Sequence, residues 1–159
     1  MNNIFLLLGS NLGNRKEFLQ QAVEQIEVEI APLTCVSSVY ETQSWGKTDE
    51  PDYLNQVLEL QTTMPAREVL QKVLAIEQSM GRKRKEKWGS RIIDIDILFY
   101  GNAIINEPDL KVPHPELHKR RFTLEPLAEI AADFVHPVLN KGILQLKNEL
   151  NDSLIVKKV

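Results

Sequence analysis

The sequence predicts one α+β domain spanning residues 1–159. Short apolar runs of strand length alternate with longer segments in which apolar residues recur at helical spacing. No internal repeat, low-complexity tract or linker-like stretch separates these segments. A chain of 159 residues can also bury a sizeable hydrophobic core, so one domain is the most economical arrangement.

The N-terminal part of the chain predicts a strand, a helix and a second strand. Residues 4–8 form an apolar run that predicts a buried strand. The turn at residues 9–15 lacks the Gly-Lys-Ser/Thr ending of a Walker loop, so we interpret it as a structural connection. Apolar residues at helical spacing then predict a helix over residues 15–27, and the Thr- and Val-rich residues 33–41 predict a strand.

The middle of the chain predicts a polar loop, a central strand and a helix. The loop covers residues 42–52, and its Trp45 is either pinned to the body of the protein or exposed for a ligand. Residues 53–62 have the length and β tendency of a central strand. Pro65 suits the first turn of the helix that follows, and Gly81 is a plausible residue just past its end.

The C-terminal part predicts one more strand, an extended segment and two helices. The β-branched run over residues 91–99 predicts a strand, and residues 104–105 form a short apolar piece. Two prolines predict an extended conformation for residues 111–115. Residues 124–130 and 144–150 have helical patterns.

Two carboxylates, Asp94 and Asp96, interrupt the apolar strand over residues 91–99. Side chains alternate between the faces of a strand, so both carboxylates point the same way, with Cα atoms about 7 Å apart. The neighbours expected on their face are Ile92 and Leu98, and those expected on the opposite face are Ile93, Ile95 and Ile97. Two ionised carboxylates among isoleucines repel each other and lose hydration unless cations compensate them. The alternative is a pair of aspartates on an ordinary solvated face.

The segment before this strand, residues 82–91, is strongly basic. It holds six Lys and Arg side chains and one Glu, a local charge of +5 in a chain whose net charge is −3. A basic loop that leads into an acidic strand suits a polyphosphate with a divalent metal, because Arg and Lys bind phosphate oxygens and carboxylates bind hard cations. Taken alone, the loop would be interpreted as a solvated charged turn, and His114 as a structural histidine beside prolines.

Composition and charge exclude several classes of protein. The isoelectric point is near 5.7, whereas a general nucleic-acid binder is usually basic overall. The single cysteine, Cys35, cannot form an internal disulfide, and its place in a predicted strand favours a buried thiol. Nothing resembles a signal peptide, and the run at residues 4–8 is too short to cross a bilayer, so we expect a cytoplasmic protein.

Six motifs occur in a fixed order along nearly the whole chain. They are Gly9-Ser10-Asn11-Leu12-Gly13, Pro51-Asp52-Tyr53-Leu54-Asn55, Gly81-Arg82-x-Arg84, Lys87-Trp88-Gly89-Ser90-Arg91-x-x-Asp94-x-Asp96, Val112-Pro113-His114-Pro115 and Arg120-Arg121-Phe122. In order and spacing these motifs resemble those of 6-hydroxymethyl-7,8-dihydropterin pyrophosphokinases, enzymes of folate biosynthesis. The resemblance implies a ferredoxin-like α/β sandwich, with helices packed on a mainly antiparallel sheet.

The resemblance also implies a reaction. The family transfers the β,γ-pyrophosphate of ATP to the hydroxymethyl group of the pterin and releases AMP, with two Mg²⁺ ions. In such a reaction most of the catalysis comes from positioning and charge neutralisation. The expected partners are therefore the small molecules ATP and 6-hydroxymethyl-7,8-dihydropterin, with no nucleic acid and no membrane, and the expected assembly is a monomer.

Roles for individual residues follow from the same resemblance. Asp94 and Asp96 would hold the two metals and contribute to catalysis with Arg82 and Arg91, and one of the two aspartates, with Asp96 favoured, would accept the hydroxyl proton. The residues that match the ATP site are Glu77, Arg82, Arg84, Lys87, Trp88, Arg91, Ile97, Lys111, His114, Pro115 and Arg120. Those that match the pterin site are Thr42, Gln43, Trp45, Gly46, Tyr53, Asn55, Asp94 and Phe122.

The chain departs from the family pattern at three places. Residues 43–45 read Gln-Ser-Trp where better-known members often carry prolines and a leucine, the basic loop is one residue shorter than in some members, and Leu74 replaces a polar residue that some relatives place near adenine. The sequence also allows two alternative functions. A nucleotide-binding regulator would have no need of both aspartates, and an RNA-binding module would show paired aromatic residues on its central strands, where this chain has Ile and Leu.

Overall fold

The computed structural model describes residues 1–42, 52–81, 92–151 and 155–159. Its elements in chain order are β1 (Asn2–Ser10), α1 (Arg15–Glu29), β2 (Leu33–Val36), β3 (Tyr40–Thr42), β4 (Tyr53–Thr62), α2 (Ala66–Ser79), β5 (Asp94–Tyr100), β6 (Ile105–Glu107), β7 (Leu110–Val112), the short 3-10 helix η1 (Leu117–Lys119), α3 (Arg121–Ala131), α4 (Ile143–Glu149) and β8 (Val156–Lys158). Two predicted loops lie outside the described residues: the basic loop over residues 82–91, and the polar loop over residues 42–52 except for its first and last residues.

The main sheet is antiparallel in every pairing that the structure describes. Its strand order is β5-β1-β4-β3-β8, and β2 also pairs with β4. Strands β6 and β7 form a separate two-stranded hairpin. The prediction of a central strand over residues 53–62 is confirmed, because β4 pairs with β1, β2 and β3. The α+β class and the mainly antiparallel sheet are confirmed as well.

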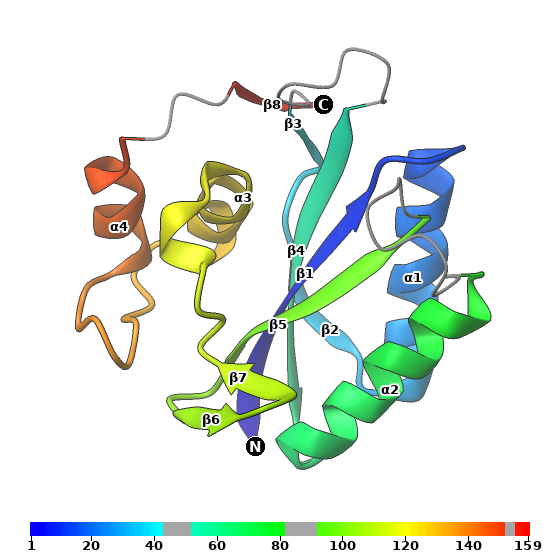
Figure 1. Ribbon diagram of the computed structural model, residues 1–159, viewed down its shortest axis with the longest axis horizontal. Coiled ribbons are helices and arrows are strands. Elements are labelled where there is room, and N and C mark those ends of the chain that lie inside the picture. The colour runs from blue at the N-terminus through cyan, green and yellow to red at the C-terminus, as the bar shows by residue number, and fades with distance from the viewer. Residues whose placement is uncertain (43–51, 82–91, 152–154) are drawn as a thin grey trace.

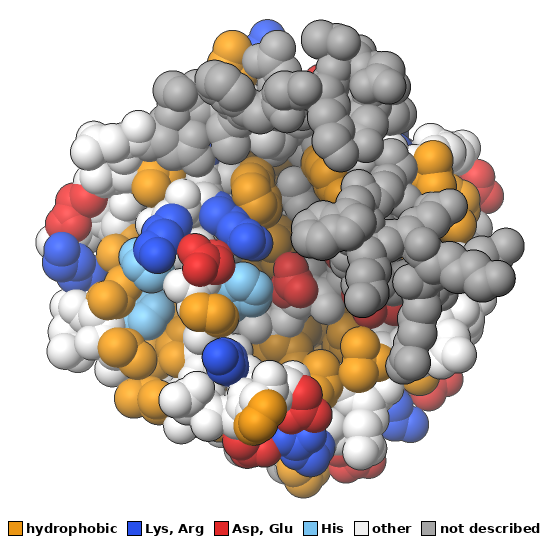
Figure 2. All heavy atoms as spheres, viewed as in Figure 1, with side chains coloured by type: hydrophobic (Ala, Val, Ile, Leu, Met, Phe, Trp, Pro, Cys, Tyr) orange, Lys and Arg blue, Asp and Glu red, His pale blue; other side chains and the backbone are white. Residues whose placement is uncertain are grey.

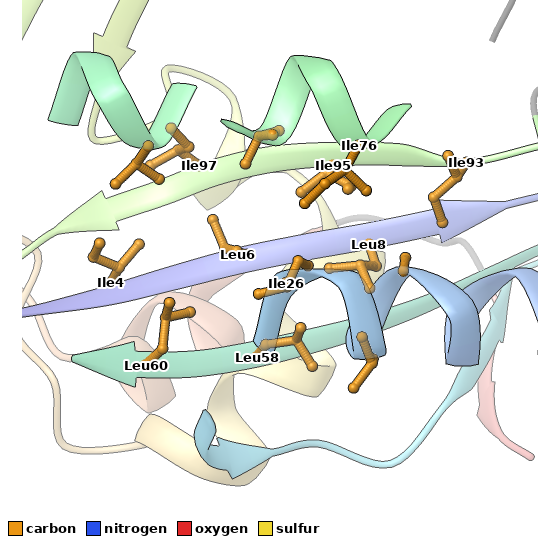
Figure 3. Packing of buried hydrophobic residues seen from close by; sticks show 14 of the residues in the cluster. Ile4, Leu6, Leu8, Ile26, Leu58, Leu60, Ile76, Ile93, Ile95 and Ile97 are labelled. Carbon is orange, nitrogen blue, oxygen red and sulfur yellow. The ribbon is translucent and has the colours of Figure 1, made fainter. Parts of the chain in front are cut away.

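Helices cover both faces of this sheet (Figure 1). Helices α1 and α2 pack on one face, where the largest hydrophobic cluster lies. Figure 3 shows isoleucine and leucine side chains of β1, β4 and β5 meeting Ile26 of α1 and Ile76 of α2 in this cluster. Helices α3 and α4 cover the other face, with a second cluster built around Phe5, Phe99 and Leu124. Burial on both faces explains why β1 reads as a continuous apolar run.

Helix ends follow from local chemistry. The side chain of Asn14 accepts a hydrogen bond from the backbone N–H of Glu17, which caps the start of α1. Pro65 directly precedes α2, and Gly81 follows its C-cap residue with a φ of +94°. A positive φ is easily adopted only by glycine, so the predicted end of this helix is confirmed.

The prediction of one strand over residues 33–41 is wrong, because the structure has two strands there. Strand β2 ends at Val36 and β3 begins at Tyr40. Between them the backbone N–H of Ser38 points to the carboxylate of Glu129 on α3 instead of joining the sheet. A hydrogen bond to a distant helix cannot be anticipated from local β propensity. The thiol of Cys35 in β2 is partly exposed, not buried as predicted.

Strand β5 begins later than predicted and contains an irregularity. It starts at Asp94, and Ile92 packs against the cluster under α1 and α2, so the prediction that Ile92 shares the face of the aspartates is wrong. Ile93, Ile95 and Ile97 lie in that same cluster, as predicted. Leu98 lies in the cluster on the other face of the sheet, which is the face predicted for it. The pairing of β5 with β1 shifts near Leu98, since Leu6 pairs with Ile97 and Phe5 with Phe99. This bulge puts both Leu98 and Phe99 into the second cluster.

The remaining differences lie near the C-terminus. Helix α3 begins at Arg121, three residues before the predicted start, and β8 was not predicted at all. No helix among the described residues is long and apolar enough to cross a bilayer.

Candidate active site

An open pocket of about 390 Å³ lies along the edge of β5. The lining residues are Leu70, Leu74 and Glu77 of α2, Asp94, Ile95, Asp96 and Ile97 of β5, and Pro108, Asp109, Leu110, Lys111, His114 and Pro115 of the segment that follows. Strand β5 is an edge strand of the main sheet, so one side of its backbone faces this pocket. Figure 2 shows histidine and basic side chains gathered near the middle of the viewed face, with acidic and apolar side chains among them.

The pocket brings together most of the predicted nucleotide-site residues that the structure describes. They are Glu77, Ile97, Lys111, His114 and Pro115, and the two predicted metal ligands, Asp94 and Asp96, line the same pocket. Asp94 and Asp96 are partly exposed, whereas Ile95 and Ile97 beside them are buried. This alternation confirms that the two carboxylates share one face of β5.

Glu77 has a structural contact in the pocket wall. Its side chain is 3% exposed, and Oε2 accepts a hydrogen bond of 2.7 Å from the backbone N–H of Ile95. An edge strand presents backbone donors that no neighbouring strand satisfies, and a buried carboxylate is a strong acceptor for one of them. Glu77 therefore ties α2 to β5. Because donors alternate along a strand, the N–H of Ile97 points toward the same edge.

His114 is held in place by the bulge in β5. Its backbone N–H donates to the carbonyl oxygen of Leu98 at 3.0 Å, and its Nδ1 accepts from the backbone N–H of Glu116 at 3.1 Å. Burial lowers the pKa of His114 below its ordinary value, the charge of Asp96 opposes this shift, and that of Arg120 adds to it. A neutral ring with an accepting Nδ1 carries its proton on Nε2, so the pocket gains one N–H donor.

Gly9 lies at the junction of three strands. It pairs with Asn55 of β4 on one side and with Asp94 of β5 on the other. A Cβ added at Gly9 would lie 2.8 Å from Nδ2 of Asn55, which donates to the carbonyl oxygen of Leu8 at 3.2 Å. The side chain of Asn55 therefore occupies the space over Gly9. Two strand spacings set the Cα atoms of Asn55 and Asp94 about 10 Å apart on one face of the sheet.

The other predicted pterin residues lie near this junction. Thr42 of β3 pairs with Tyr53 of β4, and Tyr53 precedes Asn55 by two residues, so it shares its face of the sheet. The Oγ1 atom of Thr42 is buried and has no hydrogen-bond partner among the described residues. Phe122 packs at the margin of the cluster under α3, on that same side of the sheet.

Arg120 connects the two groups of residues. Its guanidinium lies 5.5 Å from the centre of the Phe122 ring, within range of a cation–π contact. Its charge also lowers the pKa of His114, in addition to the effect of burial. Arg120 does not line the pocket, but it lies between the predicted nucleotide and pterin residues.

Eight predicted site residues lie outside the described residues and stay predictions. They are Gln43, Trp45, Gly46, Arg82, Arg84, Lys87, Trp88 and Arg91. The part of the chain that the structure describes contains no group of three or more His, Cys, Asp or Glu side chains arranged to hold a metal. A pair of carboxylates nevertheless fits Mg²⁺, which keeps several waters and takes further oxygens from substrate phosphates.

Gly9 is a site residue that sequence reasoning missed. We interpreted the glycine-containing turn at residues 9–15 as a structural connection, but Gly9 belongs to β1 and directly adjoins Asn55 and Asp94. The signal was the glycine itself, since a strand that is otherwise apolar rarely loses a side chain unless another group approaches closely.

Comparison with known proteins supports the resemblance found in the motifs. Residues 5–132 match the family model described as 7,8-dihydro-6-hydroxymethylpterin-pyrophosphokinase. A protein of Aquifex aeolicus, named 2-amino-4-hydroxy-6-hydroxymethyldihydropteridine pyrophosphokinase, is 41% identical over 149 residues, which cover 94% of this chain and 92% of that protein. A Haemophilus influenzae protein of the same name is 37% identical over 99% of this chain and 98% of its own length. Neither alternative function draws support from these names.

Solved structures share the fold. The Plasmodium falciparum HPPK-DHPS structure with SDX-DHP superimposes with a TM-score of 0.76 and 18% identity. The match covers 94% of this chain and 43% of that longer chain. At this identity the likeness concerns the fold alone, and it agrees with the predicted helix-covered, mainly antiparallel sheet.

Proposed function

Because the chain belongs to the 7,8-dihydro-6-hydroxymethylpterin-pyrophosphokinase family, we propose that the pocket along β5 transfers pyrophosphate from ATP to the pterin. The chain is an enzyme, a pyrophosphokinase that acts on hydroxymethyl-dihydropterin in folate synthesis. The identity of the donor, the placement of both substrates and the roles of single residues are our proposal.

The nucleotide occupies the pocket along β5. Leu70, Leu74 and Ile97 offer apolar surface for the flat adenine ring, and the outward-facing backbone of β5 offers polar atoms at its edge. Lys111 and the Nε2 proton of His114 supply donors for phosphate oxygens. The predicted cations Arg82, Arg84, Lys87 and Arg91 would complete the binding of the triphosphate, with Arg82 and Arg91 assisting the transfer and Trp88 sealing the pocket.

Asp94 and Asp96 are the residues that would hold two Mg²⁺ ions. Their carboxylate oxygens are the ligands that this cation prefers, and both line the pocket that we assign to the nucleotide. When bound, the metals would neutralise phosphate charge and lower the pKa of the attacking hydroxyl.

The pterin lies beside Asn55, between Tyr53 and Phe122. Stacking between two aromatic rings suits a flat heterocycle, and Asn55 with the buried hydroxyl of Thr42 offers polar partners for its amide edge. A buried hydroxyl without a partner costs free energy, which a ligand can recover by hydrogen bonding to it. Substrates that lack this edge would leave the protein groups unpaired, which gives sharp selectivity.

The proposed transfer needs little covalent assistance. The hydroxymethyl oxygen attacks the β-phosphorus, its O–H proton passes to a carboxylate, and the bond from the β-phosphorus to the AMP oxygen breaks. We assign the proton acceptor to Asp96, which lines the same pocket as Lys111 and His114, the proposed phosphate-binding residues. The protein mainly holds the two substrates in line and excludes water.

One observation carries this placement: Gly9 separates Asn55 from Asp94 within one face of the sheet. A span of about 10 Å fits a bicyclic ring whose amide edge is read at Asn55 while its hydroxymethyl group reacts beside Asp94. The two clusters share one sheet, which also supports our proposal that residues 1–159 form one pterin pyrophosphokinase domain. We propose that it acts as a monomer on small molecules.

The product that accompanies the pterin diphosphate tests the proposal. Purified protein is incubated with MgATP and 6-hydroxymethyl-7,8-dihydropterin, and the nucleotide products are separated by chromatography. We expect AMP, formed only when the pterin is present. ADP would indicate ordinary phosphoryl transfer and would contradict the proposal, as would the absence of both nucleotides.

A further inference from the structure

Glu129, near the C-terminal end of α3, accepts four hydrogen bonds from Ser38, in the connection between β2 and β3, and from Tyr40, the first residue of β3. Its Oε1 accepts from the Tyr40 hydroxyl at 2.6 Å and from the Ser38 backbone N–H at 3.2 Å. Its Oε2 accepts from the same N–H at 3.0 Å and from the Ser38 hydroxyl at 2.9 Å. One carboxylate thus joins the helical layer to the start of β3, at two residues that are separated by one position.

The carboxyl group of Glu129 is ionised at neutral pH. Partial burial would raise the pKa of Glu129, but the hydrogen bonds from Tyr40 and Ser38 outweigh burial, and the charge of Lys158 adds to them, so the pKa lies below its ordinary value. The pKa of Tyr40 is raised by burial and by Glu129, which keeps its hydroxyl protonated and donating. Hydrogen bonds to an ionised carboxylate are the stronger kind.

The two elements joined by Glu129 carry opposite walls of the proposed pterin site. On the sheet side, Tyr40 pairs with Asn55, and β3 ends two residues later at Thr42. On the helix side, α3 begins at Arg121, so Phe122 lies in its first turn, about 10 Å along the helix axis from Glu129. Residues 121–131 form one continuous helix that includes Pro126, so the anchorage of this helix at Glu129 bears on the position of Phe122.

We infer that Glu129 is a positioning residue for the pterin site, an inference that rests on the proposed function. Through Tyr40 and Ser38 it sets the separation between Phe122 on α3 and the ends of β3 and β4. It touches neither substrate. Loss of its charge would leave the nucleotide pocket unaltered, because the residues that line that pocket come from α2, β5 and residues 108–115, and none of them lies on α3 or β3.

The test uses Glu129→Gln, which keeps the size of the side chain and removes its charge. We expect the KM for the pterin to rise about tenfold and the KM for ATP to stay within about twofold, since the weakened hydrogen bonds loosen only the contact between α3 and the start of β3. Calorimetric titration of the pterin in the presence of a non-hydrolysable ATP analogue should show the same weakening in Kd.

Glu125→Gln is the matched control. Glu125 lies one turn earlier on α3, but its carboxylate pairs with Lys147 of α4 and with Arg121 on its own helix. A loss of helix stability alone would be shared by both variants, so the control should leave the KM for the pterin unchanged. Thermal unfolding of both variants records any general loss of stability.

Tyr40→Phe gives an independent arm should the Gln variant fold poorly. Tyr40 acts through Glu129, so the two substitutions should not add. The variant that carries both Tyr40→Phe and Glu129→Gln should therefore have a pterin KM close to that of Glu129→Gln alone. An unchanged pterin KM in both Glu129→Gln and Tyr40→Phe, or an equal rise for both substrates, would overturn the inference. These outcomes differ from failure of the proposed function, in which the unaltered protein itself forms no pterin-dependent AMP.

Discussion

Gly9 shows how one missing side chain brings two functional groups into register. Asn55 occupies the space over it, and Asp94 adjoins it on the other side. Gly9→Ala places a Cβ 2.8 Å from Nδ2 of Asn55, so that amide must shift and its bond to the Leu8 carbonyl must weaken. We expect a loss of about 1–3 kcal/mol of stability and at least a tenfold rise in the KM for the pterin.

Gly142→Ala controls for the general effect of adding a methyl group. A Cβ there meets its nearest atom at 3.6 Å, an ordinary contact, and Gly142 has a φ of −70° that alanine readily adopts. This variant should match the unaltered protein in steady-state kinetics, and its urea unfolding records the cost of alanine at the N-cap of α4. An equal KM for the pterin in Gly9→Ala and Gly142→Ala would show that pterin binding does not depend on the present position of the Asn55 side chain.

At the scale of single residues, the sequence predicted the aspartate pair but not its neighbour. Asp94 and Asp96 were recognisable because period-two alternation places both on one face, and the structure has them there. The place of Gly9 beside Asn55 depends on the register between β1 and β4, which a single sequence does not reveal.

At the scale of elements, the β6–β7 hairpin forms one wall of the nucleotide pocket and is attached to α2 by Arg67. The guanidinium pairs with Asp109 at 2.9 Å and with Glu107, and these contacts hold the pKa of Asp109 below its ordinary value. Because the pairs are solvent-exposed, they position the hairpin more than they stabilise the fold.

Arg67→Ala should therefore weaken nucleotide binding and leave pterin binding unchanged. We expect a rise in the KM for ATP of about threefold, little change in the thermal midpoint, and a smaller difference from the unaltered protein at high salt. Lys72→Ala removes a comparable surface pair from α2, to Glu29 of α1, and should have no kinetic effect. Equal KM values for ATP in the two variants would exclude a positioning role for the hairpin contact.

Elements with a strong local pattern were predicted well. Helices α1 and α2 have clear helical periodicity, strand β1 is a continuous apolar run, and β4 has the length and β tendency of a strand; the structure confirms all four. The break at Ser38 depends on Glu129, which lies 91 positions away in the sequence, and β8 is a short strand defined by its pairing with β3. Neither contact leaves a local signal, so neither could be predicted.

At the scale of the whole molecule, a buried histidine makes folding stability depend on pH. Nδ1 of His136 accepts from the backbone N–H groups of Val138 and Leu139, both at 3.1 Å, and its ring packs edge-on against Phe99. Burial, and to a lesser degree the charge of His118, lowers the pKa of His136 below 6.5. Protonation of Nδ1 would break both hydrogen bonds.

The sign of the pH effect follows from this shift. Between the lowered pKa of the folded state and the value near 6.5 of the unfolded chain, the unfolded state binds more protons, so stability falls as pH decreases. His136→Asn keeps an acceptor for the turn but does not titrate. Urea unfolding at pH 7.5, 6.5 and 5.5 should show a flatter profile in this variant, with a residual slope because His114 is shifted in the same direction. An unchanged slope would contradict the assignment.

Two hydrophobic clusters on one sheet explain why the α+β class was predictable from the whole chain. Apolar side chains on both faces of the sheet require helices on both sides, and their patterns are present in the sequence. What could not be predicted is how the bulge at Leu98 brings His114 to the pocket, because a bulge is set by pairing between strands.

The central claim is that Asp94 and Asp96 hold metal at the reacting phosphates. The most direct test is the rate of AMP formation by Asp94→Asn and by Asp96→Asn, measured with saturating MgATP and pterin. Each substitution keeps the shape of the side chain and removes a charge that would hold metal at the reacting phosphates. We expect each rate to fall by several orders of magnitude with the fold intact by circular dichroism. A near-unaltered rate in either variant would show that the transfer does not depend on this pair of carboxylates.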